Sequence, residues 1–143
     1  MNWKEEAAQR LGDYRYMRHA VHSLHRELKR LQLEAIALKS LTMDSACTPG
    51  AGGRKEDRLL NNLVRRQQLE DSLEQAELWI STTDDALACL MPEEKRLLER
   101  MFLEGDRGNA TELAQQMGLE RSTLYRRRDD ALRKFAVALY GRS

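Results

Sequence analysis

The stretch that decides the fold is residues 14–38, YRYMRHAVHSLHRELKRLQLEAIAL. Eight of its apolar residues follow one another at alternating steps of three and four residues. They are Tyr14, Met17, Val21, Leu24, Leu28, Leu31, Ala35 and Leu38. Such steps place the side chains on one face of an α-helix, as in long helices that pack against other long helices. We therefore predict a single helix over residues 2–41, with these residues as its seam.

Toward the N-terminus the seam is less regular. Trp3 and Ala7 continue it, but Arg10 occupies the next heptad place. The apolar Leu11 stands beside Arg10, and we expect Leu11 to substitute for it in the core. Trp3 and Trp79 are expected to pack in the core as well, unless one of them is exposed and anchors a partner protein.

A second stripe of the same period predicts a helix over residues 55–90. The stripe consists of Leu59, Leu63, Leu69, Leu73, Ala76, Ile80, Leu87 and Leu90, with Arg66 and Thr83 in the remaining heptad places. Asn61 and Asn62 are intrinsically unfavourable in the middle of a helix. Either one of them faces the seam and fixes its register, as a buried polar residue does in a coiled coil, or both lie on the exposed face.

Residues 42–54 separate the two stripes. Pro49, Gly50, Gly52 and Gly53 cluster there, which predicts a flexible loop. Because the two predicted helices are similar in length, an antiparallel helical hairpin with coiled-coil-like packing is the economical arrangement. A coiled coil between two chains satisfies the same periodicity. Residues 1–90 are thus expected to form a first domain, for oligomerisation such as a homodimer or for docking a partner.

The composition excludes several classes of protein. Of the 143 residues, 33% are charged and 41% are hydrophobic, which is too apolar for a disordered chain and too charged for a membrane protein. No apolar run approaches the roughly 20 residues that span a bilayer, and residues 1–10 lack the layout of a signal peptide. The two cysteines, Cys47 and Cys89, are too few for a disulfide framework or a zinc site. We expect an all-α, soluble, cytoplasmic protein with no membrane partner.

Pro92 marks the start of a second predicted domain, residues 91–143, because proline fits the first turn of a helix. That helix is expected to continue through Phe102. Residues 105–109, Gly-Asp-Arg-Gly-Asn, predict a turn in which Asn109 caps the next helix.

The spacing after that turn is typical of a helix-turn-helix. Such a unit needs a small residue where its two helices cross, a glycine four residues later in the turn, and an apolar residue six residues further on, in the shared core. Ala114, Gly118 and Leu124 stand at these spacings. We therefore predict a helix-turn-helix within residues 110–128.

The start of its second helix is basic. Residues 120–143 hold seven basic and three acidic side chains, although the whole chain has a net charge of only +1. In a helix-turn-helix these first residues enter the major groove, where arginine reads guanine and Ser or Thr contacts bases or phosphates. The other interpretation is the tail of a three-helix bundle with a solvated arginine face. The combination of spacing and charge favours binding of double-stranded DNA.

Two resemblances support this interpretation. Residues 118–125, GLERSTLY, followed by ALRKF at 131–135, resemble the C-terminal promoter-reading region of bacterial sigma factors. The whole chain is similar to the ArpU-like phage regulators of Firmicutes and their prophages. The segments that carry this similarity are MNWKEEA at 1–7, LLNNLV at 59–64, STLYRR at 122–127 and ALYG at 138–141. The resemblance implies a phage or prophage transcription regulator, an activator of late genes that assists or partly replaces a sigma factor.

Carried over by position, the resemblance implies a set of DNA-contacting residues. The set is Arg121, Ser122, Thr123, Tyr125 and Arg126. Arg127 and Arg128 are expected to add phosphate contacts. RNA polymerase is the expected protein partner of the helical hairpin.

Two other classes of function fit parts of the pattern. A DNA-packaging protein such as a small terminase subunit also combines a helix-turn-helix with long helices, but it forms a ring and usually places the DNA-binding unit first. A coiled-coil adaptor would instead bind protein through its C-terminal unit.

Enzymatic and metal-binding functions are not expected. His19, His22 and His25 recur every three residues but fall outside the seam, and His19 and His25 lie about 240° apart around a helix. No arrangement of residues suggests nucleophilic catalysis, and adjacent carboxylates diverge by about 100° on a helix. We therefore predict no catalytic residues, no metal site and no cofactor.

Overall fold

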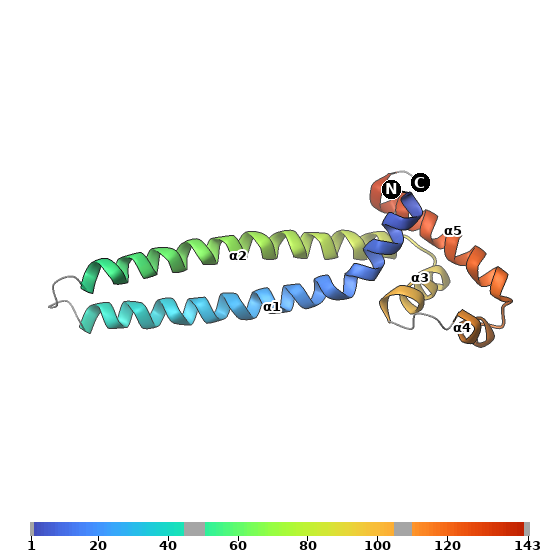
Figure 1. The fold of residues 1–143 in the computed structure, drawn as a ribbon. Coiled ribbons are helices and arrows are strands. Elements are labelled where there is room, and N and C mark those ends of the chain that lie inside the picture. Colours follow the sequence, from blue (N-terminus) through green and yellow to red (C-terminus); the bar gives the residue numbers. More distant parts are fainter. Residues whose placement is uncertain (1, 45–50, 105–109, 142–143) are drawn as a thin grey trace. The chain divides into compact units, whose positions relative to one another are not determined.

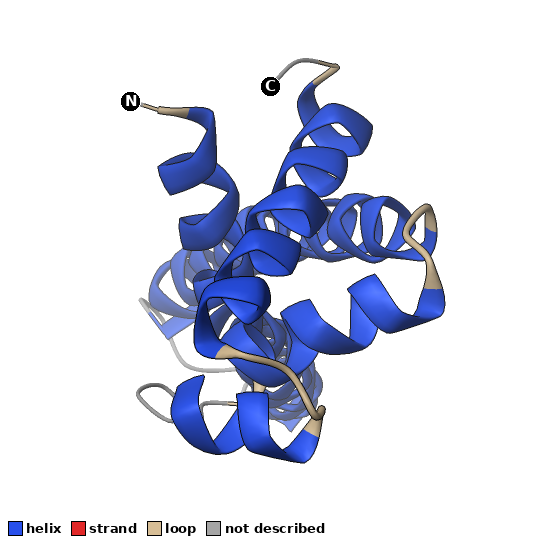
Figure 2. Ribbon diagram, turned by 90° about the vertical axis from the view of Figure 1, so that its right-hand side faces the viewer, coloured by secondary structure: helices blue, strands red, loops and turns tan. Residues whose placement is uncertain are grey.

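The computed structural model describes residues 2–44, 51–104 and 110–141, and every regular element in them is helical (Figures 1 and 2). The elements are α1 (Trp3–Asp44), α2 (Ala51–Ala88), α3 (Pro92–Leu98), the π-helical turn η1 (Glu99–Leu103), α4 (Ala110–Gln116) and α5 (Arg121–Tyr140). The all-α prediction is therefore confirmed, and the first two elements form the expected long helix pair.

The predicted loop at residues 42–54 is too long. Helix α1 continues to Asp44 and α2 begins at Ala51, so only residues 45–50 separate them, and these lie outside the described residues. Gly52 and Gly53 lie in the first turn of α2. Glycine keeps its backbone N–H, so it can enter a helix, at a conformational cost of about 1 kcal/mol relative to alanine in the helix interior. The predicted turn at residues 105–109, with its cap Asn109, also lies outside the described residues.

The chain divides into two compact units, and the division does not fall at residue 90. Unit 1 contains Met1–Met17 and Trp79–Ser143, and unit 2 contains Arg18–Leu78. The start of α1 and the end of α2 therefore belong to the same unit as α3, α4 and α5. The functions expected of residues 1–90 and 91–143 stay predictions.

Unit 2 is built on the seam between α1 and α2. Its core consists of Leu28, Leu31, Leu69 and Leu73, with Val21 and Leu24 packed against them. The α1 seam is confirmed, since Ala35 and Leu38 are buried as well.

The predicted α2 stripe contains one error, because Leu63 does not lie on the buried face. Leu63 is 43% exposed, whereas Asn62 is 4% exposed. Asn62 continues the steps of three and four between Leu59 and Arg66, and Leu63 lies about 100° away from that line. The Asn62 side-chain amide donates a hydrogen bond to the Leu31 carbonyl of α1 (2.9 Å), and its oxygen accepts one from Arg66 (2.8 Å). The interpretation that one asparagine faces the seam is therefore confirmed for Asn62.

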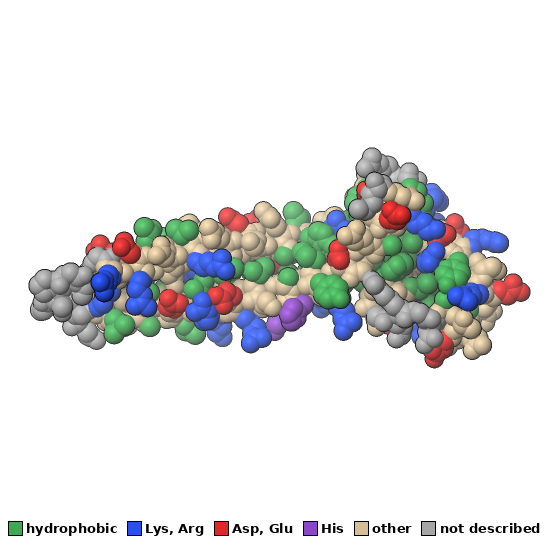
Figure 3. Space-filling model, in the orientation of Figure 1, with side chains coloured by type: hydrophobic (Ala, Val, Ile, Leu, Met, Phe, Trp, Pro, Cys, Tyr) green, Lys and Arg blue, Asp and Glu red, His purple; other side chains and the backbone are tan. Residues whose placement is uncertain are grey.

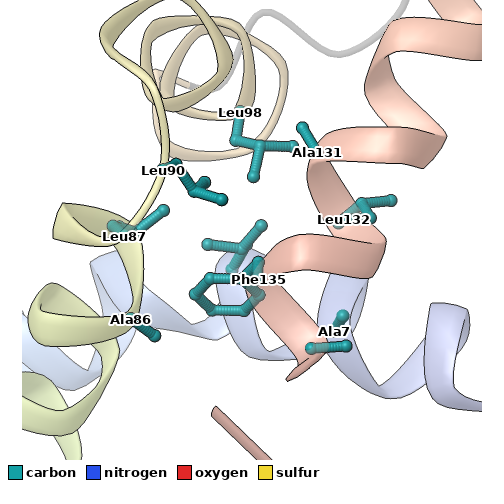
Figure 4. Packing of buried hydrophobic residues seen from close by; sticks show 10 residues of the cluster. Ala7, Ala86, Leu87, Leu90, Leu98, Ala131, Leu132 and Phe135 are labelled. Atoms are coloured by element: carbon teal, nitrogen blue, oxygen red, sulfur yellow. The ribbon is translucent and has the colours of Figure 1, made fainter. Parts of the chain in front are cut away.

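Unit 1 has a core that joins the ends of the long helices to the C-terminal helices. Its buried residues are Ala7, Leu11, Ala86, Leu87, Leu90, Leu98, Ala131, Leu132, Phe135 and Ala136. Figure 4 shows Phe135 of α5 in the middle of the labelled side chains, between those of α2 and Ala7 of α1. Trp3 is half-buried and packs against this cluster.

Leu11 substitutes for Arg10 in this core, as the sequence predicts. Leu11 is fully buried. The Arg10 side chain instead donates hydrogen bonds to the Thr83 hydroxyl (2.9 Å) and the Trp79 carbonyl (3.1 Å), and its guanidinium lies 4.4 Å from the centre of the Trp79 ring. Trp79 is therefore half-buried beneath an arginine and not part of the apolar cluster.

Candidate nucleic-acid interface

A tight turn at Gly118 connects α4 to α5. The Leu119 N–H donates to the Ala114 carbonyl (2.8 Å) and the Gly118 N–H to the Gln115 carbonyl (3.2 Å), which is the hydrogen-bond pattern of a Schellman cap. Gly118 has a φ of 66°, a conformation that glycine adopts without the steric cost of a Cβ. The positive φ predicted for this glycine is confirmed.

The helices on either side of this turn share a small core. Leu97, Leu113, Ala114 and Leu124 form it, and Met117 and Leu119 pack against them. Ala114 is 4% exposed and Leu124 is fully buried. The small Ala114 of α4 and the apolar Leu124 of α5 thus belong to one buried cluster.

Helix α5 begins without a side-chain cap. Its N-cap residue is Glu120, which is extended (φ −72°, ψ 152°) and whose carboxylate makes no capping hydrogen bond. The first backbone bond runs from the Leu124 N–H to the Glu120 carbonyl (2.9 Å). N–H groups of the first turn therefore remain available, and the positive end of the helix dipole lies there, a combination that favours an anionic neighbour.

The predicted DNA-contacting residues divide between three faces of α5. Ser122 and Arg126 are exposed and lie on the side opposite the buried Leu124. Arg133 is exposed on the same side, seven residues beyond Arg126. The sequence interpretation missed Arg133, although its i+7 spacing from Arg126 was the signal that placed it on this face.

One flank of α5 carries a stacked group around Tyr125. The Arg128 guanidinium lies 4.8 Å from the centre of the Tyr125 ring and that of Arg121 lies 5.7 Å away. The ring thus has two cations near it, within the range of cation–π attraction. These contacts hold the half-buried Tyr125 in place. Figure 3 shows that Lys and Arg side chains gather beside α5 on the face in view.

Arg128 is also bound by an acid. Its Nε and Nη2 atoms both donate to Asp129 Oδ1 (3.1 and 2.9 Å), and Lys4 of α1 donates to Asp129 Oδ2 (2.8 Å). Partial burial opposes ionisation of this carboxyl, but the hydrogen bonds from Lys4 and Arg128 outweigh burial and hold the pKa of Asp129 below its usual value. Asp129 therefore links the start of α1 to the candidate interface.

The opposite flank faces α3. The exposed Arg127 lines a shallow pocket together with Met91, Glu94, Met117 and Lys134. Glu94 closes one side of this pocket, since its carboxylate accepts hydrogen bonds from Lys134 (2.8 Å) and from the Met91 N–H (3.3 Å). Thr123, half-buried, lies about 40° from Arg127 around the helix. Arg127 and Arg128, both predicted phosphate contacts, thus lie on different flanks.

The histidines of α1 do not come together. His19 lies 3.4 Å from the Ser23 hydroxyl, and His25 lies 3.1 Å from Glu77 of α2. Among the described residues no three His, Cys, Asp or Glu side chains are placed to hold a metal ion.

Comparison with known proteins adds no assignment: no family model, no curated protein and no solved structure matches this chain. Within the described ranges, none of the helices has both the length and the apolar character that crossing a membrane requires.

Proposed function

We propose that the chain is a sequence-specific DNA-binding transcription regulator. In this proposal α4 and α5 act as a helix-turn-helix and the first two turns of α5 enter the major groove. The observation that carries the proposal is the left-handed turn at Gly118 combined with the burial of Leu124 in the core shared with α4. This combination leaves Ser122 and Arg126 directed away from the core at the start of α5.

Each side chain has a role that its position supports. Arg126, exposed and opposite the core, reads guanine through two hydrogen bonds. Ser122 and Thr123 contact bases or phosphates near the start of the helix, where the dipole favours an anion. Arg121 and Arg127 reach phosphates on opposite flanks of α5. Tyr125 and Arg128 stack on each other and hold this surface in shape.

The long helix pair has a supporting role in the proposal. We propose that α1 and α2 of one chain close as an antiparallel hairpin. The Arg10 side chain donates a hydrogen bond to Thr83, and the Asn62 side chain donates one to the Leu31 carbonyl, so a later residue of α1 pairs with an earlier residue of α2. The hairpin would supply dimerisation or a docking surface for RNA polymerase. The resemblance to ArpU-like and sigma-factor regions favours late promoters of a phage or prophage as the DNA target.

Fluorescence anisotropy tests this proposal with the full chain on tiled DNA fragments around its own gene and the neighbouring operon. Preferential binding to one fragment is expected in the presence of scrambled competitor. Arg126→Ala should weaken binding to that fragment by about 1–3 kcal/mol. Each lost phosphate contact, as in Arg127→Ala, should lower the slope of log K against log salt by about 0.9.

Arg58→Ala is the matched control, because Arg58 is an exposed arginine of α2 and its removal changes the net charge equally. Equal, weak binding to every fragment would contradict sequence-specific recognition by this chain alone. Absence of binding at low salt would contradict the DNA proposal and favour a protein adaptor.

A further inference from the structure

The side of α1 that faces away from α2 carries a second ordered row of residues in unit 2. Each member precedes a seam residue by two positions and so points about 200° away from the seam. The row, called here the α1 outer face, consists of His19, His22, Arg26, Lys29, Leu33 and Ile36. All six are exposed, and Leu33 and Ile36 are 59% and 62% exposed.

Helix α2 has a row built in the same way. The α2 outer face consists of Leu60, Val64, Gln67, Asp71, Glu74 and Leu78, each two positions before a seam residue and each exposed. Leu60 and Val64 are 57% and 44% exposed. Figure 3 shows hydrophobic side chains along the part of α2 that follows its first turns. Large apolar side chains that are exposed on both faces of one helix pair are typical of a site for contact with another protein surface.

The two outer faces are opposite in charge. The α1 outer face has Arg26 and Lys29 and no acid, and the α2 outer face has Asp71 and Glu74 and no base. On α2 the acidic character extends beyond the row itself, since residues 67–78 contain four acidic and no basic side chains. One outer face therefore attracts the other.

The charged and apolar parts also lie at matching levels along the pair. Because Asn62 bonds to the Leu31 carbonyl, the apolar residues of the two faces, Leu33 and Ile36 on α1 and Leu60 and Val64 on α2, lie at a similar position along the helix pair. The bond between His25 and Glu77 sets the charged parts at another. Two copies that lie side by side in the same direction would thus bring apolar against apolar and base against acid.

We propose that unit 2 binds a second copy of this chain, with the α1 outer face of one copy on the α2 outer face of the other. In this contact Leu33 and Ile36 meet Leu60 and Val64 of the second copy, and Arg26 meets Asp71. The contact joins two different surfaces, so each copy retains one uncovered outer face until a further copy or ring closure covers it. The proposal does not depend on DNA binding, because all of these residues belong to unit 2, whereas α4 and α5 belong to unit 1.

Two charge-reversed full-length chains test the proposal by light scattering after size exclusion, without DNA. The first carries Arg26→Glu and Lys29→Glu, and the second carries Asp71→Lys and Glu74→Lys. The wild-type chain should form particles of two or more copies. Each variant alone should raise the dissociation constant about tenfold or more, because like charges then meet across the contact. An equimolar mixture of the two variants should associate as the wild type does.

The matched control for the first variant is Lys39→Glu with Arg58→Glu, the same change of charge on two exposed residues beside the seam and off both outer faces. Circular dichroism at 222 nm verifies that each variant keeps its helix content. A wild-type chain that remains monomeric at all concentrations would overturn the proposal and leave the faces to a different protein. Undiminished association of both variants, or a mixture that fails to associate, would overturn it equally.

Discussion

At position 118 the backbone requires a residue that tolerates a positive φ. A Cβ built on Gly118 meets no other atom within 4 Å, so any cost of a substitution is conformational and not steric crowding. Gly118→Ala should therefore lower the free energy of unfolding by about 1–2 kcal/mol, the cost of a left-handed L-residue. Gly118→Asn should cost less, because asparagine adopts this conformation more readily. Urea denaturation followed by circular dichroism measures both, and equal stability of the alanine variant and wild type would contradict the strained turn.

Asp129 makes stability depend on pH in a defined direction. Hydrogen bonds from Lys4 and Arg128 lower its pKa in the folded chain. The stabilisation is complete above the pKa of the unfolded chain, about 3.9, and is lost as the pH falls through the lower folded pKa. Because Lys4 and Asp129 are 38% and 39% exposed, their coupling at neutral pH should be only about 0.2–1 kcal/mol.

A double-mutant cycle of Lys4→Ala and Asp129→Asn measures that coupling. It should be constant from pH 7 to about 5 and decline at more acidic pH. Asp130→Asn is the control, since the neighbouring Asp130 is exposed and should show no coupling to Lys4. A coupling that grows on acidification would contradict the assignment.

At the scale of the helix, periodicity predicted α1 well and α2 with one error. Steps of three and four identify the buried face because an α-helix repeats every 3.6 residues. In α2 the apolar character of Leu63 favours it over the polar Asn62 as a buried residue, although Asn62 keeps the spacing. Residue type gives the wrong prediction of burial there, because a polar side chain is buried where it has a hydrogen-bond partner. The partner of Asn62 is the Leu31 carbonyl, which belongs to another helix and cannot be identified from the α2 sequence.

Asn62 should define how α1 and α2 align. Asn62→Leu replaces a buried polar residue with an apolar one, which should leave stability unchanged or raise it while permitting shifted registers. Spin labels at positions 33 and 60, with both cysteines replaced by serine, report this as a broadened distance distribution in pulsed electron resonance. Asn61→Leu, the exposed neighbour, should leave the distribution narrow. A single narrow distance in the Asn62→Leu chain would show that apolar packing alone sets the register.

At the scale of the whole chain, the sequence predicted the local features of the candidate site but not the distant residues of α1 that pack against α5. The turn, the plug and the basic edge of α5 are local patterns within about twenty residues. The contact of Lys4 with Asp129 and the burial of Ala7 and Leu11 against α5 join residues more than a hundred positions apart. No local period encodes such contacts, because the seam of α1 identifies a buried face without identifying what covers it.

This shared core predicts which truncations fold. Fragment 91–143 lacks Ala7, Leu11, Ala86, Leu87 and Leu90, so half of the buried cluster around Phe135 is missing. Removal of large buried side chains costs about 2–5 kcal/mol each, so this fragment should show no cooperative thermal transition.

By contrast, deletion of residues 25–38 and 57–70 removes two whole heptads from each long helix and none of the unit 1 clusters. That chain should retain a cooperative transition and DNA binding, while self-association through the outer faces should be lost. Thermal melts with anisotropy test both statements: a cooperative transition in fragment 91–143, or unfolding of the heptad-deleted chain, would contradict a core shared between the helix pair and α5.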